Sequence, residues 1–230
     1  MFWQDEAPES REPVSLDDVV DVSYTLVGRT IPVDHAHTLL EALSRALPWL
    51  PEQDDAGVHS IHVAASQNGW YRPDEATGGV LHISRRTRMT LRLPGARIRD
   101  AQALTGATLD MEGHAITVGP LSMRPLLPLP TLFARSVAGP REQSEEAFLQ
   151  DTATELRRLG IRPRKLLCGR VGEVHTPTGG IFTRSLLVAD LTPDESLALQ
   201  RHGVGPDRKL GCGLFVPHKG VGPVRKADNG

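Results

Sequence analysis

The chain of 230 residues is long enough for one large domain or for two domains of about 100 residues each. Its formal net charge of −2 gives no bulk signal for nucleic-acid binding, but the distribution is uneven, because residues 1–21 hold seven acids and one arginine. The remainder therefore carries a net charge of +4, and its basic residues gather in 85–99, 157–170 and 201–226.

The residue content argues against several classes of protein. Two cysteines far apart, Cys168 and Cys212, do not make a disulfide framework or a zinc site, and the nine histidines lack metal-ligand spacing. The start of the chain is acidic, unlike a signal peptide, and no apolar run approaches the ~20 residues of a membrane span. We expect a reduced, cytoplasmic protein with no metal ion, no cofactor and no membrane contact.

Hydrophobic periodicity predicts the order β-α-β-β-α-β for the first half of the chain. Residues 1–17 are acidic and contain proline, which is typical of a disordered tail. Apolar and polar residues then alternate as in a half-buried strand, and a helix with Asp34 as its N-cap follows. The expected elements are strands over 18–28, 61–65 and 80–93, a further strand or strand pair through Leu109, Ile116 and Val118, and helices over 35–47 and 98–105.

The expected strand over 80–93 is the most informative periodic segment. Its odd positions are mostly apolar, although two polar residues interrupt them, and its even positions include Arg86, Arg88 and Arg92. Because successive side chains of a strand point to opposite faces, one face would be apolar and the other would carry the three arginines. No acid alternates with them, so an anionic partner such as RNA would relieve their repulsion. The alternative is a solvated polar face, the common location of charged residues.

Residues 120–130 contain four prolines, which predict a stiff boundary between an N-terminal domain over 18–125 and a C-terminal domain over 131–217. The second half repeats the element order of the first, so the expected fold is α+β, with two ferredoxin-like domains in tandem. The expected elements of the second half are strands over 132–138, 165–174, 181–191 and 209–216, helices over 143–159 and 192–202, and a flexible tail over 218–230.

Residues 203–213, the glycine-rich loop, follow the last expected helix. Glycine lets another chain approach the backbone closely. The order of helix, loop and strand is opposite to that of a P-loop, because a helix C-terminus, which repels phosphate, meets the loop here. Two cations would therefore have to attract phosphate, and the alternative is a turn or bulge with no ligand. The glycines and cations in question are Gly203, Gly205, Gly211, Gly213, Arg208 and Lys209.

The glycine spacing and four further motifs resemble the sixth Cas family, the CRISPR-associated endoribonucleases that process repeat RNA. The pattern is similar to the branch of this family found in the Myxococcus-type (MYXAN) subtype of type I systems, and it covers roughly residues 19–217. The four motifs are Val33-Asp34-His35-Ala36, Ala42-Leu43-Ser44-Arg45-Ala46, Gly57-Val58-His59 and the arginine-rich run over 86–94.

The resemblance implies a metal-independent endoribonuclease that cuts CRISPR precursor RNA within its repeat. In such an enzyme the 2′-OH beside the scissile phosphate attacks it, which leaves a 2′,3′-cyclic phosphate and a 5′-hydroxyl. The implied partners are the repeat RNA, as a stem-loop with flanking single strand, and other subunits of a type I interference complex. A non-catalytic RNA-binding subunit of such a complex is the alternative, and it would need the arginines and the loop but no catalytic histidine.

The candidate catalytic residue is His35, because histidine can give or take a proton near neutral pH and the resemblance implies a catalytic histidine near the start of the first helix. His59 and His37 are the reserve candidates. An exposed or capping histidine and a solvated arginine are the alternatives to functional roles. The expected RNA-binding residues are Arg86, Arg88, Arg92, Gly203, Gly205, Arg208, Lys209, Gly211, Gly213 and, from the resemblance, Ser44 and Arg45.

Overall fold

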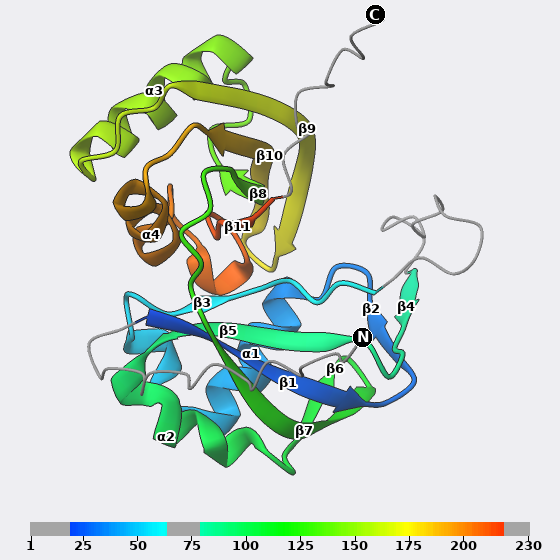
Figure 1. Ribbon diagram of the computed structural model, residues 1–230. Coiled ribbons are helices and arrows are strands. Elements are labelled where there is room, and N and C mark those ends of the chain that lie inside the picture. Colours follow the sequence, from blue (N-terminus) through cyan, green and yellow to red (C-terminus); the bar gives the residue numbers. More distant parts are fainter. Residues whose placement is uncertain (1–18, 64–78, 219–230) are drawn as a thin grey trace, which may run out of the picture.

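The computed structural model describes residues 19–63 and 79–218. Each half of the chain forms an antiparallel sheet with helices packed against it (Figure 1). The predicted tail over 1–17, and all but one residue of the predicted tail over 218–230, lie outside the described residues. No helix in the described part of the chain is long and apolar enough to cross a membrane.

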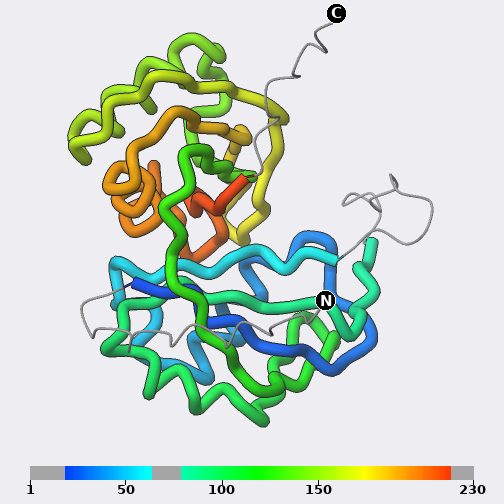
Figure 2. Tube along the Cα trace, in the orientation of Figure 1, coloured from blue at the N-terminus to red at the C-terminus, as the bar shows by residue number. Residues whose placement is uncertain are grey.

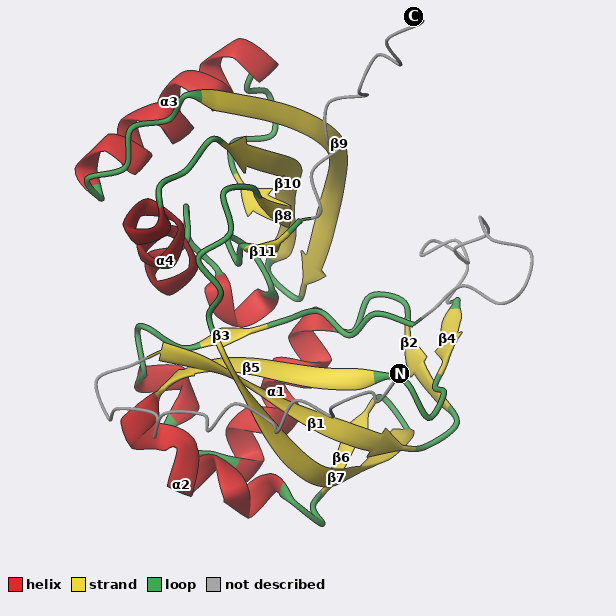
Figure 3. Ribbon diagram, in the orientation of Figure 1, coloured by secondary structure: helices red, strands yellow, loops and turns green. Residues whose placement is uncertain are grey.

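The first half forms a five-stranded sheet with α1 and α2 on one face (Figure 3). The strand order is β3-β5-β1-β7-β6, in which the first four strands have the ferredoxin-like arrangement and β6 is added at one edge. The elements are β1 (Val19–Val27), α1 (Ala36–Ala46), β3 (Gly57–Val58), β5 (Arg88–Pro94), α2 (Ile98–Ala101), β6 (Thr108–Met111) and β7 (His114–Pro125), with β2 (Thr30–Pro32) and β4 (Val80–His82) paired in a small separate sheet.

The second half repeats this arrangement in a four-stranded sheet with the order β11-β8-β10-β9. Residues 126–131 carry the chain from the first sheet to the second (Figure 2). The predicted α+β fold with ferredoxin-like domains in tandem is therefore confirmed. The elements of this half are β8 (Leu132–Ala138), α3 (Glu145–Arg158), β9 (Lys165–Thr176), β10 (Gly179–Ala189), α4 (Pro193–His202) and β11 (Val216–Pro217).

Alternation along β1 places Val20, Val22, Tyr24 and Leu26 in the core with α1 and α2. The Tyr24 hydroxyl donates to the carbonyl oxygen of Ala101 in α2 over 2.8 Å, which satisfies this buried polar group. Burial of each large apolar side chain stabilises the fold by about 1.5–3 kcal/mol. The helices of the first half therefore cover one face of its sheet and leave the other, open face available to the second half.

The predicted long strand over 80–93 is in fact two strands that belong to different sheets. β4 pairs with β2, whereas β5 pairs with β1 in the five-stranded sheet. A turn separates them, in which the Thr87 N–H donates to the Ser84 carbonyl over 2.9 Å and the Ser84 N–H donates to Thr87 Oγ1 over 3.0 Å. Arg86 consequently lies in this turn and not on the face of a strand.

Two expectations near α1 are also corrected. The helix begins directly after His35 without a side-chain cap, because the Asp34 carboxylate instead accepts from the backbone N–H of His175 in the second half, over 3.0 Å. The expected strand over 61–65 is replaced by the earlier and shorter β3, and residues 64–65 lie outside the described part of the chain. The partner of Asp34 is distant in sequence, so local pattern could not reveal it.

The predicted last strand over 209–216 is wrong as well. Residues Arg208–Leu210 form a 3-10 turn, and only β11 pairs with β8. Gly211 and Gly213 have φ values of 85° and 66°, so the backbone turns where an alternating strand was expected. Alternation along a strand over 209–216 would place Phe215 on the same side as Lys209, away from the core, but Phe215 is fully buried in the core of the second half.

Candidate functional site

The glycine-rich loop packs closely against the protein itself. Its four glycines all have positive φ, between 66° and 85°, a conformation that favours glycine. A Cβ on Gly211 would lie 2.6 Å from Ser60 Oγ in the first half, and one on Gly213 would lie 2.1 Å from the Val204 carbonyl oxygen. A Cβ on Gly203 would meet the Gly213 carbonyl in the same way. These contacts account for Gly203, Gly211 and Gly213 without an RNA partner, and the positive φ accounts for Gly205.

The two cations of the loop are bonded to backbone carbonyls. Arg208 donates to the carbonyl oxygens of Arg201, over 2.9 Å, and of His202, which are at the C-terminal end of α4. Lys209 Nζ donates to the Pro51 carbonyl of the first half over 2.6 Å. The 3-10 turn of the loop, Arg208–Leu210, accordingly lies against the segment that follows α1 (Figure 2). The expectation that both cations face RNA is corrected. Arg208 joins the loop to the end of α4, and Lys209 joins the loop to the first half of the chain.

Arg92 is also not available to RNA, because its side chain is 0% exposed. Its Nε and one terminal nitrogen donate to the two Asp21 carboxylate oxygens, over 2.8 and 2.9 Å. The other terminal nitrogen donates to the carbonyl oxygens of Gln200 (2.9 Å) and Phe215 (2.8 Å) in the second half. Arg92 is thus a buried link between the halves with four hydrogen bonds, which corrects its predicted phosphate contact.

The structure contradicts the assignment of His35 as the proton-transfer residue. Its ring is buried, at 3% exposure, and Nε2 accepts a hydrogen bond from the Ile61 N–H over 2.9 Å. Because Nε2 accepts, the ring proton is on Nδ1, which lies 3.0 Å from the Pro32 carbonyl oxygen. Both nitrogens therefore bond the backbone, and the side chain fixes the start of α1 to the segment after β3.

The remaining candidates of α1 lie apart from the open face of the sheet. His37 Nδ1 is 3.9 Å from the Glu41 carboxylate on the same helix. Ser44 Oγ donates to the carbonyl one turn earlier over 2.7 Å, and Arg45 donates to the Asp110 carbonyl of β6 over 3.3 Å. The structure does not bring these three side chains together with the arginines of β5.

A cationic pocket of about 300 Å³ lies on the open face of the first sheet, where it meets β11. Arg86 and Arg124 face it, and their guanidinium groups make no hydrogen bond or ion pair with the described residues. Arg88 also faces it and donates to the Arg85 carbonyl over 2.7 Å. We call it the His59 pocket. Its lining residues are Asp21, Ser23, His59, Ser60, His62, Arg86, Arg88, Thr90, Arg124 and Val216.

His59 is the histidine in this pocket whose environment suits proton transfer. Its backbone N–H donates to the Thr90 carbonyl over 3.0 Å, and its Nε2 lies 3.5 Å from Asp21 Oδ1, longer than an ordinary hydrogen bond. Burial lowers the pKa of His59 below its usual 6.5, and Arg92 and Arg208 lower it further against the opposing effect of Asp21. The imidazole is therefore neutral at pH 7 and can accept a proton.

Comparisons with known proteins agree with this fold. A family model described as Cas6 Crispr matches residues 20–220. The chain belongs to the Cas6 family. It is 33% identical over 198 residues to the CRISPR-associated endonuclease Cas6 of Myxococcus xanthus (strain DK1622), and the match covers 86% of this chain and 81% of that relative. The family predicted from the motifs is confirmed.

Solved structures share the Cas6 fold at low sequence identity. One, described as "CRISPR associated protein Cas6", has a TM-score of 0.61 and 9% identity, with 88% of this chain and 100% of that chain covered. Another, described as "An RAMP protein binding different RNA substrates", has a TM-score of 0.58 and 13% identity, with 86% and 98% covered. At such identities the likeness supports the fold alone.

Within this Cas6 family member, sequence reasoning missed seven of the residues that line the His59 pocket, among them Asp21, Ser23 and Arg124. Asp21 and Ser23 are the polar members of the alternating first strand, and Arg124 lies next to a proline in the expected boundary. β1 pairs on one side with β5 and on the other with β7, so Asp21 is opposite both Arg92 and Arg124. The alternation could have marked the two polar residues of β1 as open-face residues, but only the strand order brings Arg124 beside them.

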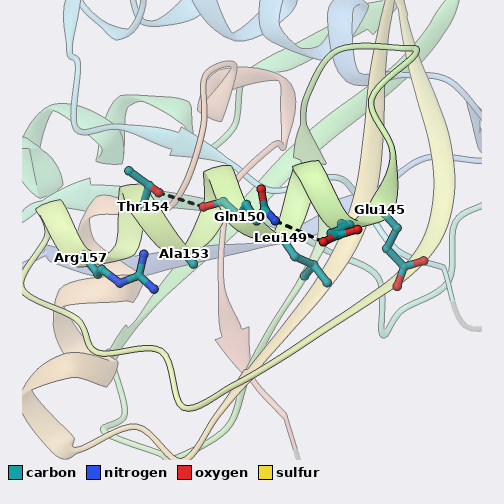
Figure 4. A pocket seen from close by; sticks show the side chains of 7 residues that line it. Glu145, Leu149, Gln150, Ala153, Thr154 and Arg157 are labelled. Carbon is teal, nitrogen blue, oxygen red and sulfur yellow. Dashed lines mark hydrogen bonds between the residues drawn. The ribbon is translucent and has the colours of Figure 1, made fainter.

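A larger hollow, of about 660 Å³, runs along the outer surface of α3 (Figure 4). Its lining side chains come from successive turns of that helix, and α3 lies far from the first sheet (Figure 1). Acidic and basic side chains are mixed there, without a histidine, so its chemistry does not suit RNA cleavage. The lining residues are Glu145, Glu146, Leu149, Gln150, Ala153, Thr154 and Arg157.

Proposed function

We propose that this protein is a metal-independent endoribonuclease that cuts CRISPR precursor RNA within its repeat. The observation that carries the proposal is the His59 pocket, in which a neutral histidine lies among arginines on the open face of the sheet. The M. xanthus relative, named as a CRISPR-associated endonuclease, supports the same activity. His59, first considered as a reserve to His35, is the proton-transfer residue of this proposal.

The reaction needs few protein groups, because the RNA supplies its own nucleophile. The 2′-OH attacks the neighbouring phosphorus in line, His59 accepts the 2′-OH proton, and the 5′-oxygen leaves and takes up a proton. The products are a 2′,3′-cyclic phosphate and a 5′-hydroxyl. Arg86, Arg88 and Arg124 supply the positive charge that stabilises the phosphorane.

The same cations would hold RNA before and after cleavage. Arg86 and Arg124 have guanidinium groups available for phosphate, so they anchor the strand in the pocket that holds His59. We propose that the cleaved repeat stays bound, and that the protein works in the cytoplasm with other subunits of a type I interference complex. The cleaved RNA would stay bound because the arginines also contact phosphates other than the one at which the chain is cut.

The test is incubation of the purified protein with a repeat RNA in excess EDTA, followed by analysis of the RNA ends. The proposal predicts cleavage at one position, a 2′,3′-cyclic phosphate on the upstream product, and no cleavage of the same RNA with 2′-deoxyribose at that position. Cleavage that requires a divalent ion, or that continues without the 2′-OH, would contradict the mechanism. Tight binding without any cleavage would instead identify a non-catalytic RNA-binding subunit.

A further inference from the structure

We infer that Asp21 is a positioning residue for His59, with its carboxylate held toward Nε2 of the ring by Arg92 so that Nδ1 faces the RNA. This inference rests on the proposed catalytic role of His59. In this inference Asp21 acts on His59 without touching the substrate. Because Arg92, which holds Asp21, is bonded to the second half of the chain, the site depends on that half.

The geometry forms a connected series from the histidine to the second half. Asp21 is on the open face of β1, opposite Arg92 of β5. Arg92 holds both carboxylate oxygens, over 2.8 and 2.9 Å, and Asp21 Oδ1 is also 3.5 Å from His59 Nε2. The remaining Arg92 nitrogen is bonded to the carbonyls of Gln200 and Phe215. The carboxylate can neither rotate nor withdraw without breaking these bonds.

The position of the carboxylate selects one tautomer of His59. Among the described residues, the buried Nε2 has no hydrogen-bond partner, and the Asp21 carboxylate, 3.5 Å away, is the acceptor beside it. A proton on Nε2 is therefore favoured, which leaves the lone pair of Nδ1 to accept the 2′-OH proton. The 3.5 Å separation suits a protein without bound RNA, because catalytic hydrogen bonds often tighten only when substrate is present.

Charge supports the same arrangement. Burial would raise the pKa of Asp21, but His59 and Arg92 outweigh it and hold that pKa well below its usual range. Asp21 thus stays ionised wherever the enzyme works, and it stabilises the imidazolium that forms when His59 accepts a proton. The charged and titratable groups around His59 are Asp21 from β1, Arg92 and Arg88 from β5, Arg208 from the 3-10 turn, Arg124 from β7, and Arg86 and His62 of the pocket.

A purely structural role for Asp21 is the competing explanation, because Asp21 neutralises a buried arginine. Such a role would lower stability but would leave the tautomer of His59 and the cleavage rate of the folded protein as they are. A positioning role changes both, and it also couples the pH dependence of cleavage to Asp21, because Asp21 opposes the lowering of the His59 pKa.

The decisive variant is Asp21→Asn, assayed in single-turnover cleavage of repeat RNA across a range of pH. We expect a lower rate, by up to the ~10²–10⁴-fold that a positioned base contributes, with repeat binding retained. The rising limb of the pH–rate profile should move to lower pH, because the charge that favours the imidazolium is gone. The matched control is Asp34→Asn, which removes a carboxylate 2.6 Å from the Nδ1 of exposed His175, and it should keep the wild-type rate and profile.

A second measurement keeps the inference testable if Asp21→Asn does not fold. Nitrogen chemical shifts of the His59 ring in the folded wild-type protein report its tautomer, and we expect the proton on Nε2. A proton on Nδ1, or an Asp21→Asn protein with wild-type rate and profile, would overturn the inference. Failure of the proposed function is a different result, since wild-type protein would then not cleave repeat RNA, whereas the ring shifts can be read without any activity.

Discussion

His35 and His59 have the same side chain but different chemical environments. Both ring nitrogens of His35 meet backbone groups, one of them the N–H of Ile61, 26 residues further along the chain. Nε2 of His59 instead meets a carboxylate 3.5 Å away, at the edge of a cationic pocket. The first environment satisfies a buried polar group, whereas the second leaves a ring able to exchange a proton with a ligand.

We predict that His35→Ala mainly lowers stability. Removal of the ring leaves the buried Ile61 N–H without its acceptor, which costs about 1–3 kcal/mol in the free energy of unfolding. Urea denaturation measures this loss, and His37→Ala on the same helix should stay within about 0.5 kcal/mol of wild type. A His35→Ala protein as stable as wild type would show that these bonds do not stabilise the fold. The fraction that folds should still cleave repeat RNA.

At the scale of elements, the arginines on the open face of the first sheet differ in their surroundings. One is buried against the second half of the chain, and the others face the His59 pocket. Arg92 is within β5 and is covered by the second half, whereas Arg86 lies in the turn before β5, Arg124 is near the end of β7, and both face the pocket. A phosphate can therefore reach Arg86 and Arg124 but not Arg92.

We predict that Arg86→Ala and Arg124→Ala each weaken repeat binding and each reduce the salt dependence of binding by about one phosphate contact. Stability should change by less than about 0.5 kcal/mol, because both side chains are exposed. Binding measured over a series of salt concentrations gives the slope. Arg45→Ala, whose side chain bonds to β6, is the matched control and should keep the wild-type slope. An unchanged slope in both pocket variants would contradict this assignment.

The types and order of most helices and strands were predictable from the sequence, because their apolar residues recur with strong helical or strand periodicity. The alternation of β1 and the helical spacing of α1 gave the correct types, and α3 and α4, which have Ser144 and Thr192 as side-chain caps, begin close to the starts of the helices expected over 143–159 and 192–202. The break between β4 and β5 was not predicted, because an arginine-rich turn kept the same alternation on both sides. The path of the glycine-rich loop was also missed, because it depends on the surface of the first half.

At the scale of the whole molecule, the two halves build the site together. Arg92 and Lys209 bond across the junction, and β11 contributes Val216 to the His59 pocket. The open face of one sheet therefore becomes a pocket only when the second half is in place. Sequence alone could not predict this junction, because the bonds of Arg92 connect residues 71, 108 and 123 positions apart.

We predict that Arg92→Ala is strongly destabilising. It leaves the Asp21 carboxylate buried without its bidentate partner and breaks two bonds to the second half, and loss of one partner of a buried pair typically costs about 3–5 kcal/mol. Thermal or urea denaturation checks the loss, and it should greatly exceed that of Arg86→Ala. Equal stability of the two variants would show that the buried link contributes little.

The central claim is that His59, and not a histidine of α1, performs proton transfer. The most direct measurement is the single-turnover cleavage rate of repeat RNA by His59→Ala, with His37→Ala as the control and binding measured in parallel. We predict that His59→Ala is slower by about 10²–10⁴-fold while it still binds the repeat, and that His37→Ala cleaves at the wild-type rate. A folded His59→Ala protein that cleaves at the wild-type rate would contradict the account.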